Sequence, residues 1–307
     1  MNDPQMVRTI QQENLKNLKV LDAICKRHGI RYWIAYGSLI GTMRHKGFIP
    51  WDDDIDVGMM REDFEKLCQV PKEEWLSEGS ILVTSRDDDI RQEKMFGRVF
   101  RERSVIQSRK DVATWRVPGT GEIWHSSLML DIFVFDHVTD DEEERKRIYK
   151  RVLYISQRLY PMTKLDILPK NNSLRAKIVA AGKNLYGRLM RIAHKRPWVY
   201  LSDKCDRIIA KSTPGSRVGM YYTIDPYTYS YDDIFPLEYA PYEDMTVPVP
   251  KCWEQMLSDM YGDWRTPLPE SERDHIAFIY ADLGNGEKFI IDPIPGSLGE
   301  KELARRF

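Results

Sequence analysis

Acidic residues are concentrated in the short segment PWDDDIDVGM, residues 50–59. Within it, Asp54 and Asp56 alternate with the apolar Ile55 and Val57, and in a β-strand such alternate side chains project from one face. Two carboxylates about 4 Å apart repel each other by roughly 1 kcal/mol in water and roughly 4 kcal/mol at an effective dielectric constant of about 20. The pair therefore predicts a bound cation, and a hard ion such as Mg²⁺ or Mn²⁺ prefers oxygen ligands.

A third carboxylate and a glycine–serine pair fit the same chemistry. Asp131 interrupts the apolar segment LMLDIFVF, where an ionised group is costly unless it is paired or bound to metal. We expect it to complete a metal site with Asp54 and Asp56. Gly37 and Ser38 precede a predicted helix, whose first N–H groups attract anions such as phosphate. Together these residues predict a metal-assisted phosphoryl or nucleotidyl transfer site.

Nearby basic residues are candidates for phosphate binding. Arg44 and His45 fall at the end of the helix predicted over residues 38–46. They could bind phosphate or orient Asp52, or they could simply stabilise the helix C-terminus. Lys94 and Arg98 alternate with apolar residues in EKMFGRVFRER and could clamp the phosphates of a nucleotide. An exposed strand face would have the same pattern.

Two structural explanations compete with a catalytic one for the acidic segment. Acidic runs are usually solvated loops. The acids of residues 52–63 also resemble the spacing of an EF-hand calcium loop, but Val57 stands where that loop requires glycine.

The surrounding pattern predicts the elements that hold these residues. Residues 5–28 place apolar side chains at helical spacing and end before Gly29, a typical helix C-cap. Residues 61–69 also have a helical pattern. Short strands are predicted at residues 30–36, 52–59, 80–85, 94–100 and 128–136. The fold class is therefore α+β, a mixed sheet flanked by helices.

The chain divides into three predicted parts. Residues 1–139 carry the candidate site and form a catalytic core. Residues 140–212 are mainly helical and are expected to form an attached helical subdomain that faces the acceptor or a membrane. Residues 213–307 are rich in proline and tyrosine and look irregular apart from a helix near residues 251–262, and we expect this C-terminal segment to pack on the core.

Bulk composition excludes several function classes. The chain is 42% hydrophobic with a formal net charge of -1, which suits a folded protein and argues against nucleic acid as a partner. Its 4 cysteines show no C-x-x-C spacing, so neither a zinc ribbon nor a disulfide framework is predicted. No segment reads as a signal peptide or a spanning helix. We expect a cytoplasmic protein, with peripheral contact at the inner face of the membrane.

That membrane contact is suggested by residues 173–196, SLRAKIVAAGKNLYGRLMRIAHKR, which contain many basic residues and no acid. A basic amphipathic helix of this kind can lie on an anionic membrane or bind a polyanionic acceptor. It could equally pack its apolar face against the protein and leave its basic side chains in solvent.

With these residues identified, the segment AYGSLIGTMRHKGFIPWDDDIDVGMMREDFEKL, residues 35–67, closely resembles the LicD family. That family comprises transferases that move phosphocholine from CDP-choline onto bacterial surface glycans such as lipopolysaccharide and teichoic acid. Fukutin and fukutin-related protein, which transfer ribitol phosphate from CDP-ribitol, share the motif. Residues 128–136 and 235–267 resemble further blocks of the family, so the likeness spans most of residues 20–267.

The resemblance implies a nucleotidyltransferase-like fold and a divalent-metal site. Position by position, Asp54 and Asp56 match the metal-binding pair, Asp131 matches the third acid, and Gly37 and Ser38 match the phosphate-binding turn. The chain lacks the cysteine cluster with which the fukutin-related enzyme binds zinc, so zinc is not implied.

The expected reaction transfers a phospho-alcohol, phosphocholine foremost, from a CDP-alcohol to a hydroxyl of a cell-surface glycan, including a lipid-linked one, and releases CMP. Asp52, which matches a recurring acid, or one of the metal-binding carboxylates would take the proton of the hydroxyl. Three alternatives remain: a CDP-ribitol or CDP-glycerol transferase, a nucleotidyltransferase that releases pyrophosphate, and a non-catalytic metal- or glycan-binding module. A D-x-D glycosyltransferase fits less well, because it gives the glycine–serine turn no role.

Overall fold

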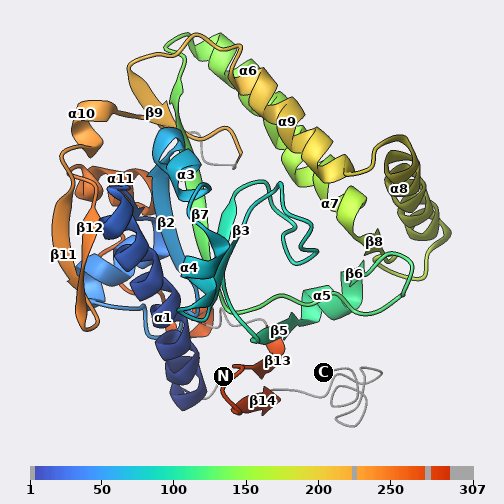
Figure 1. Ribbon diagram of the computed structural model, residues 1–307, viewed down its shortest axis with the longest axis horizontal. Coiled ribbons are helices and arrows are strands. Elements are labelled where there is room, and N and C mark those ends of the chain that lie inside the picture. The colour runs from blue at the N-terminus through green and yellow to red at the C-terminus, as the bar shows by residue number, and fades with distance from the viewer. Residues whose placement is uncertain (1–3, 223–226, 274–277, 291–307) are drawn as a thin grey trace.

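A mixed β-sheet flanked by helices forms the centre of the computed structural model, which describes residues 4–222, 227–273 and 278–290 (Figure 1). The main sheet has the order β1, β2, β7, β4, β3, with β9 and β10 joined at the side of β7. Its strands are β1 (Trp33–Ile34), β2 (Ile55–Met60), β3 (Ser80–Val83), β4 (Gly97–Arg101), β7 (Met129–Val138), β9 (Arg217–Gly219) and β10 (Tyr229–Ser230). The pair β2 and β7 is parallel and the other pairs of this sheet are antiparallel. The predicted mixed sheet is confirmed.

Smaller strand pairs lie around this sheet. They are β11 (Glu238–Tyr242) with β12 (Met245–Val249), β5 (Val105–Ser108) with β13 (Phe278–Asp282) and β14 (Lys288–Ile290), and β6 (Trp115–Arg116) with β8 (Asp166–Ile167).

The helices include a long N-terminal one, α1, which crosses the sheet and packs on β2, β7 and β4. The others are α2 (Tyr36–Ile40) continued by the π-helical η1 (Gly41–His45), α3 (Arg61–Leu67), α4 (Lys72–Leu76), α5 (Arg109–Thr114), α6 (Glu142–Tyr154) continued by η2 (Ile155–Leu159), α7 (Tyr160–Lys164), α8 (Leu174–Ala193), α9 (Pro197–Ile209), α10 (Tyr231–Ile234), α11 (Trp253–Tyr261) and the 3-10 turn η3 (Glu270–Glu272). Helix α1 spans Pro4–His28 and ends at Gly29, whose φ of +64° is the left-handed C-cap predicted for it.

The alternation of β2 and β7 gives the sheet two faces, and the one that carries Asp56 and Asp131 also carries the buried Met60 and Phe135. Ile55 and Val57 of β2 and Leu130 and Ile132 of β7 are buried in one core with Leu18 of α1. The residues between them project to the other face of the sheet. Asp56 and Asp131 therefore lie on the face away from α1.

Helices α6 to α9 form a second core, so the predicted helical character of residues 140–212 is confirmed. Its buried members include Ile148, Val152, Leu201 and Cys205. Arg61, which follows β2, donates to Asp136 of β7 at 2.9 Å and lies 3.6 Å from Asp206 of α9, so it ties this core to the sheet. None of the helices in the described part of the chain has the length and apolar character needed to cross a bilayer.

The segment after residue 213 is more ordered than predicted, because it supplies β9 to β14. Pro241 and Pro248 stand inside the β11–β12 hairpin and made its sequence look irregular. A two-stranded hairpin has free edges, where proline is tolerated. Tyr242 and Val247 of this hairpin are buried in the main core. The division into three domains stays a prediction.

Candidate active site

Three charged side chains form a row across the main sheet. Asp56 of β2 stands in register with Asp131 of β7, and Asp131 stands in register with Arg98 of β4 on its other side. Residues in register on adjacent strands project to the same face. Two of the predicted acids are therefore brought together, and a basic residue is placed beside them.

Arg98 binds the neighbouring carboxylates. It is only 1% exposed, and its Nε donates to Asp131 Oδ1 at 2.7 Å while its Nη1 donates to Glu93 Oε2 at 2.6 Å. Arg98 is thus held by two carboxylates, and its role as a phosphate clamp stays a prediction. Although burial alone would raise the pKa of Asp131, the charges of Arg98 and Lys94 hold it below its usual value.

Asp52 and Asp54 precede β2, and their carboxyl groups influence each other's pKa. Burial, followed by the charge of Asp53, raises the pKa of Asp52 to about 6. Burial, followed by the charges of Asp52 and Asp131, raises the pKa of Asp54 to about 7. The side chain of Asp54 is nevertheless exposed, so solvent and ligands can reach this carboxylate.

Asp56 has the least favourable surroundings of the group. Burial, then the charges of Asp54 and Asp131, raise its pKa well above the ordinary value. Among the residues that the structure describes, the ion pairs at this site involve Asp131 and not Asp54 or Asp56. The two carboxylates predicted to bind metal therefore repel each other without a protein cation between them.

This donor set fits a hard divalent cation. Mg²⁺ commonly takes only one or two carboxylates and completes its coordination with water and substrate phosphates. Asp54 and Asp56 can supply the two carboxylates. Across the described ranges, no group of three or more His, Cys, Asp or Glu side chains is spaced to hold a metal ion. Asp131, bound by Arg98, differs from the other two, and its place in the metal site stays a prediction.

The glycine–serine pair lies against the acidic segment. The Ser38 hydroxyl oxygen accepts the Asp56 N–H at 2.9 Å. A Cβ atom at Gly37 would lie 3.2 Å from Asp52 Oδ2, so a side chain there would crowd this acid. Helix α2 begins at Tyr36, so the pair lies inside its first turn and not before it, as we had predicted. Tyr36 has a φ of 48°, which is rare for an aromatic residue, and sequence reasoning missed this sharp turn.

Arg44 and His45 lie in η1, where the structure brings them together. Arg44 Nε lies 2.9 Å from His45 Nε2, and its Nη1 donates to the Trp264 carbonyl at 2.6 Å. Burial, together with nearby positive charge, lowers the pKa of both side chains. Their contacts attach η1 to the C-terminal segment, and their role in phosphate binding stays a prediction.

Helix α1 supplies polar side chains that sequence reasoning missed. Gln11 donates to the Asp52 carbonyl at 2.7 Å, and Asn14 donates to the carbonyls of Asp53 at 3.2 Å and Met129 at 2.7 Å. Both side chains are buried. These hydrogen bonds join the acidic loop to the start of β7 and so hold the acids of the loop at a fixed distance from Asp131. The sequence does contain a signal for these contacts, because polar residues recur at every third position on the otherwise apolar face of this helix.

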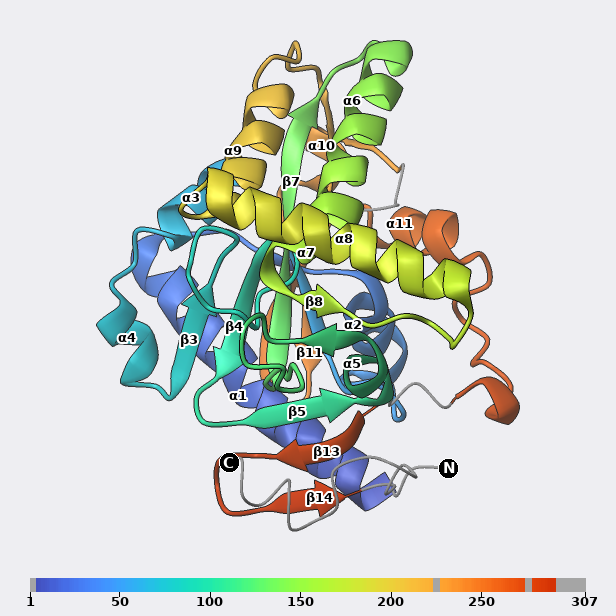
Figure 2. The same cartoon turned by 90° about the vertical axis from the view of Figure 1, so that its right-hand side faces the viewer.

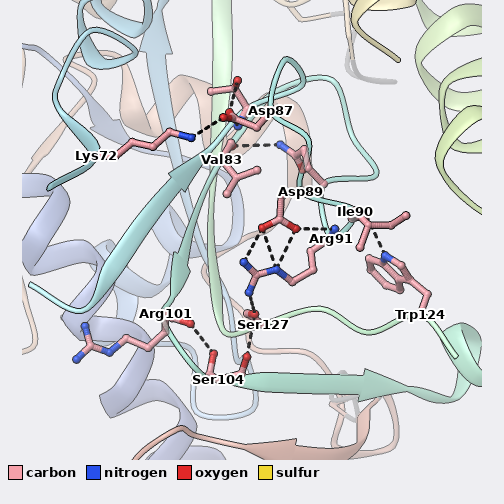
Figure 3. A network of polar contacts seen from close by, with 12 residues as sticks. Lys72, Val83, Asp87, Asp89, Ile90, Arg91, Arg101, Ser104, Trp124 and Ser127 are labelled. Atoms are coloured by element: carbon pink, nitrogen blue, oxygen red, sulfur yellow. Dashed lines mark hydrogen bonds and ion pairs between the residues drawn. The ribbon is translucent and has the colours of Figure 1, made fainter. Parts of the chain in front are cut away.

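Lys94 is positioned by the loop of residues 84–96. Figure 3 shows Asp89 bound by Arg91, which reaches on to Ser127, while the Trp124 indole donates to the Ile90 carbonyl. From this anchored loop, Lys94 Nζ lies 3.5 Å from Asp131 Oδ2 with 45% of its side chain exposed. It therefore adds an accessible positive charge next to the acids, and its role in phosphate binding stays a prediction.

A cavity of about 860 Å³ lies elsewhere, between α3 and α9. Its lining includes Arg61, directly after β2, and Asp136, near the end of β7. Asp56 and Asp131 lie near the opposite ends of these two strands. Because β2 spans about 20 Å at roughly 3.3 Å per residue, this cavity is distant from Asp54. Its charges are already paired with each other, so we place the chemistry at the unpaired carboxylates.

Known proteins resemble this chain. A family model described as LicD/FKTN/FKRP, nucleotidyltransferase domain, matches residues 29–173. The chain is 26% identical over 273 residues to the lipopolysaccharide cholinephosphotransferase LicD of Haemophilus influenzae, covering 87% of this chain and 96% of that protein. It is 40% identical over 60 residues to the human ribitol 5-phosphate transferase FKRP, covering 20% of this chain and 11% of that protein.

Proposed function

We propose that the chain transfers a phospho-alcohol from a CDP-alcohol to a glycan hydroxyl and releases CMP, because its residues 29–173 match the model of the LicD/FKTN/FKRP nucleotidyltransferase domain. Phosphocholine is the favoured group, since the relative that aligns along most of the chain is a cholinephosphotransferase acting on lipopolysaccharide. The observation that carries the proposal is the pair Asp54 and Asp56, two carboxylates that form no ion pair among the described residues although the accessible Lys94 lies near them.

Each residue at the site has a proposed part in this reaction. Asp54 and Asp56 would hold Mg²⁺ or Mn²⁺, which when bound neutralises negative charge on the phosphates. Lys94, close to Asp131 and half exposed, is available to bind a donor phosphate. Gln11 and Asn14 keep the acidic loop in place.

The reaction moves one proton from the acceptor and exchanges one bond at the phosphorus. A carboxylate, Asp52 or one of the pair Asp54 and Asp56, takes the proton of the acceptor hydroxyl. The hydroxyl oxygen forms a bond to the phosphorus that carries the alcohol. The bond between that phosphorus and the bridging oxygen breaks, and CMP leaves with the electron pair.

A thermal-shift panel tests the donor, because a ligand that binds the folded state raises the apparent melting temperature. The protein is melted with Mn²⁺ alone and with Mn²⁺ plus CDP-choline, CDP-ribitol, CDP-glycerol, CTP or a UDP-sugar. We expect one CDP-alcohol to stabilise most, and this effect to be lost in Asp56→Asn. The matched control is Asp244→Asn, which changes an exposed acid paired with Lys19.

Product analysis with the stabilising donor and a glycan acceptor completes the test. Release of CMP supports the proposal, whereas pyrophosphate from CTP identifies a nucleotidyltransferase. Stabilisation by a UDP-sugar points to a glycosyltransferase. Binding without turnover leaves the binding-module alternative.

A further inference from the structure

Helix α8 exposes large apolar side chains along its length. They are Leu174 (74% exposed), Ile178 (62%), Leu185 (57%), Leu189 (56%) and Ile192 (82%). At about 3.6 residues per turn these positions fall on one side of the helix. We call these five residues the α8 stripe. A stripe of this kind usually faces a protein core.

The α8 stripe faces away from the protein. The buried positions of the helix are Ala180 and Gly187, which lie roughly half a turn around from the stripe. A Cβ atom at Gly187 would come within 2.1 Å of the Met162 carbonyl oxygen, so α8 packs closely on α7 by this side. Figures 1 and 2 both place α8 at the outside of the molecule, with no element covering it.

Positive charge borders the stripe on both sides. By helical geometry Arg175 lies on one side of it and Lys177 and Arg188 lie on the other. Among the described residues, no ion pair engages these three side chains, whereas Arg191 and Arg196, which point back to the protein, pair with Asp166 and Asp88. The outward surface of α8 is thus apolar at its centre and cationic at its edges.

We propose that α8 docks the protein on an anionic lipid bilayer, with the stripe inserted among the acyl chains and the flanking basic residues bound to headgroup phosphates. Interfacial helices combine these two features, and each basic residue near such a surface adds to binding. A second copy of the chain fits less well, because a symmetric contact through the stripe would bring Lys177 and Arg188 of both copies together. The proposal does not depend on the transferase reaction.

Vesicle flotation of the full chain tests the proposal. Vesicles of phosphatidylcholine and phosphatidylglycerol in equal parts are compared with phosphatidylcholine alone, at low and high salt. We expect binding to the anionic vesicles, reduced by salt. The stripe variant Ile178→Ser/Leu185→Ser/Leu189→Ser should lose about tenfold or more of this binding. The charge variant Lys177→Glu/Arg188→Glu should lose the preference for anionic vesicles.

The controls separate docking from unfolding. Leu76→Ser/Leu268→Ser removes leucines that are 42% exposed at other places on the surface and should bind as the parent does. Because all of the changed side chains are exposed, each variant should keep the parent's melting temperature and its donor-induced thermal shift. Equal flotation of the parent and the stripe variant, or no flotation at low salt, would overturn the proposal. So would a parent dimer in light scattering that the stripe variant abolishes, since the stripe would then bind a second copy.

Discussion

Asp56 and Asp131 occupy facing positions on the parallel strands β2 and β7, yet they differ in charge compensation. Arg98 Nε lies 2.7 Å from Asp131, and with Lys94 it keeps the pKa of that buried carboxyl low. Asp56 has no ion pair in the described part of the chain, and burial with its acidic neighbours raises its pKa, although the charge of Lys94 opposes this rise. The sheet therefore places an ion-paired acid beside one without an ion pair, and we propose the second as a metal ligand.

Asp56→Asn should abolish metal-dependent turnover while preserving the fold. Removing one preorganised charge-stabilising group costs about 10²–10³ in kcat, and we expect at least that loss. The metal-free variant should melt no lower than the parent, because the change removes charge from a repulsive cluster. Steady-state rates and melting curves with and without Mn²⁺ measure both effects.

Asp244→Asn serves as the control for this variant, since its side chain is exposed and remote in the sequence. Parent-like turnover in Asp56→Asn would exclude Asp56 as a metal ligand. A large drop in the melting temperature of the metal-free variant would mean that the carboxylate has a structural partner.

Arg98→Met should destabilise the protein by about 3–5 kcal/mol, because it leaves the buried Asp131 without its main partner. Adding Asp131→Asn removes the stranded charge, so the double variant should regain much of this loss. A double-mutant cycle in urea measures the coupling between the two residues. Additive effects of the two substitutions would show that the ion pair does not determine the state of Asp131.

The carboxylates could be predicted from the sequence because strands have a period of two. Alternation around Asp54 and Asp56 and the apolar run around Asp131 fixed both the strands and the face of each acid. The structure brings these residues together beside Gly37 and Ser38, although their roles in metal and phosphate binding stay predictions.

The partner of Asp131 could not be predicted in the same way. Arg98 meets this acid because β4 pairs with β7 in one particular register, and a register between strands so far apart depends on the whole sheet. The contacts of α1 with the acidic loop depend likewise on how a helix crosses the sheet. The hairpin β11–β12 was missed because its prolines contradict the usual strand pattern.

Asn14→Leu should lower kcat by about tenfold to a hundredfold, although Asn14 is placed to touch backbone and not substrate. The change leaves the carbonyls of Asp53 and Met129 without their donor, which should also cost about 1–3 kcal/mol of stability. Rates at saturating donor and urea unfolding measure the two effects. Gln12→Leu, on the exposed side of the same helix, is the control and should change neither. Normal kcat in a destabilised Asn14→Leu would show that Asn14 supports the fold alone.

The raised pKa of Asp53 predicts how the free energy of unfolding of the metal-free protein depends on pH. Burial, then the charge of Asp54, raise its pKa from 3.8 to about 7 in the folded state. A carboxyl that holds its proton more tightly when folded contributes stability that is complete below about pH 4 and is lost as the pH rises to about 7. Asp53→Asn cannot lose a proton, so its stability relative to the parent should increase across this interval.

The expected gain of Asp53→Asn at pH 8 is at most about 4 kcal/mol, at roughly 1.4 kcal/mol per pKa unit. Urea unfolding in EDTA at pH 5, 6, 7 and 8 measures it. The control Asp259→Asn changes an exposed acid on α11 and should give a constant difference from the parent. Mn²⁺ should shrink the gain, because a bound cation favours the ionised form of the neighbouring acids. Parallel curves for Asp53→Asn and the parent in EDTA would mean that Asp53 is as well solvated in the folded chain as in the unfolded one, and that the acidic loop is not strained by charge.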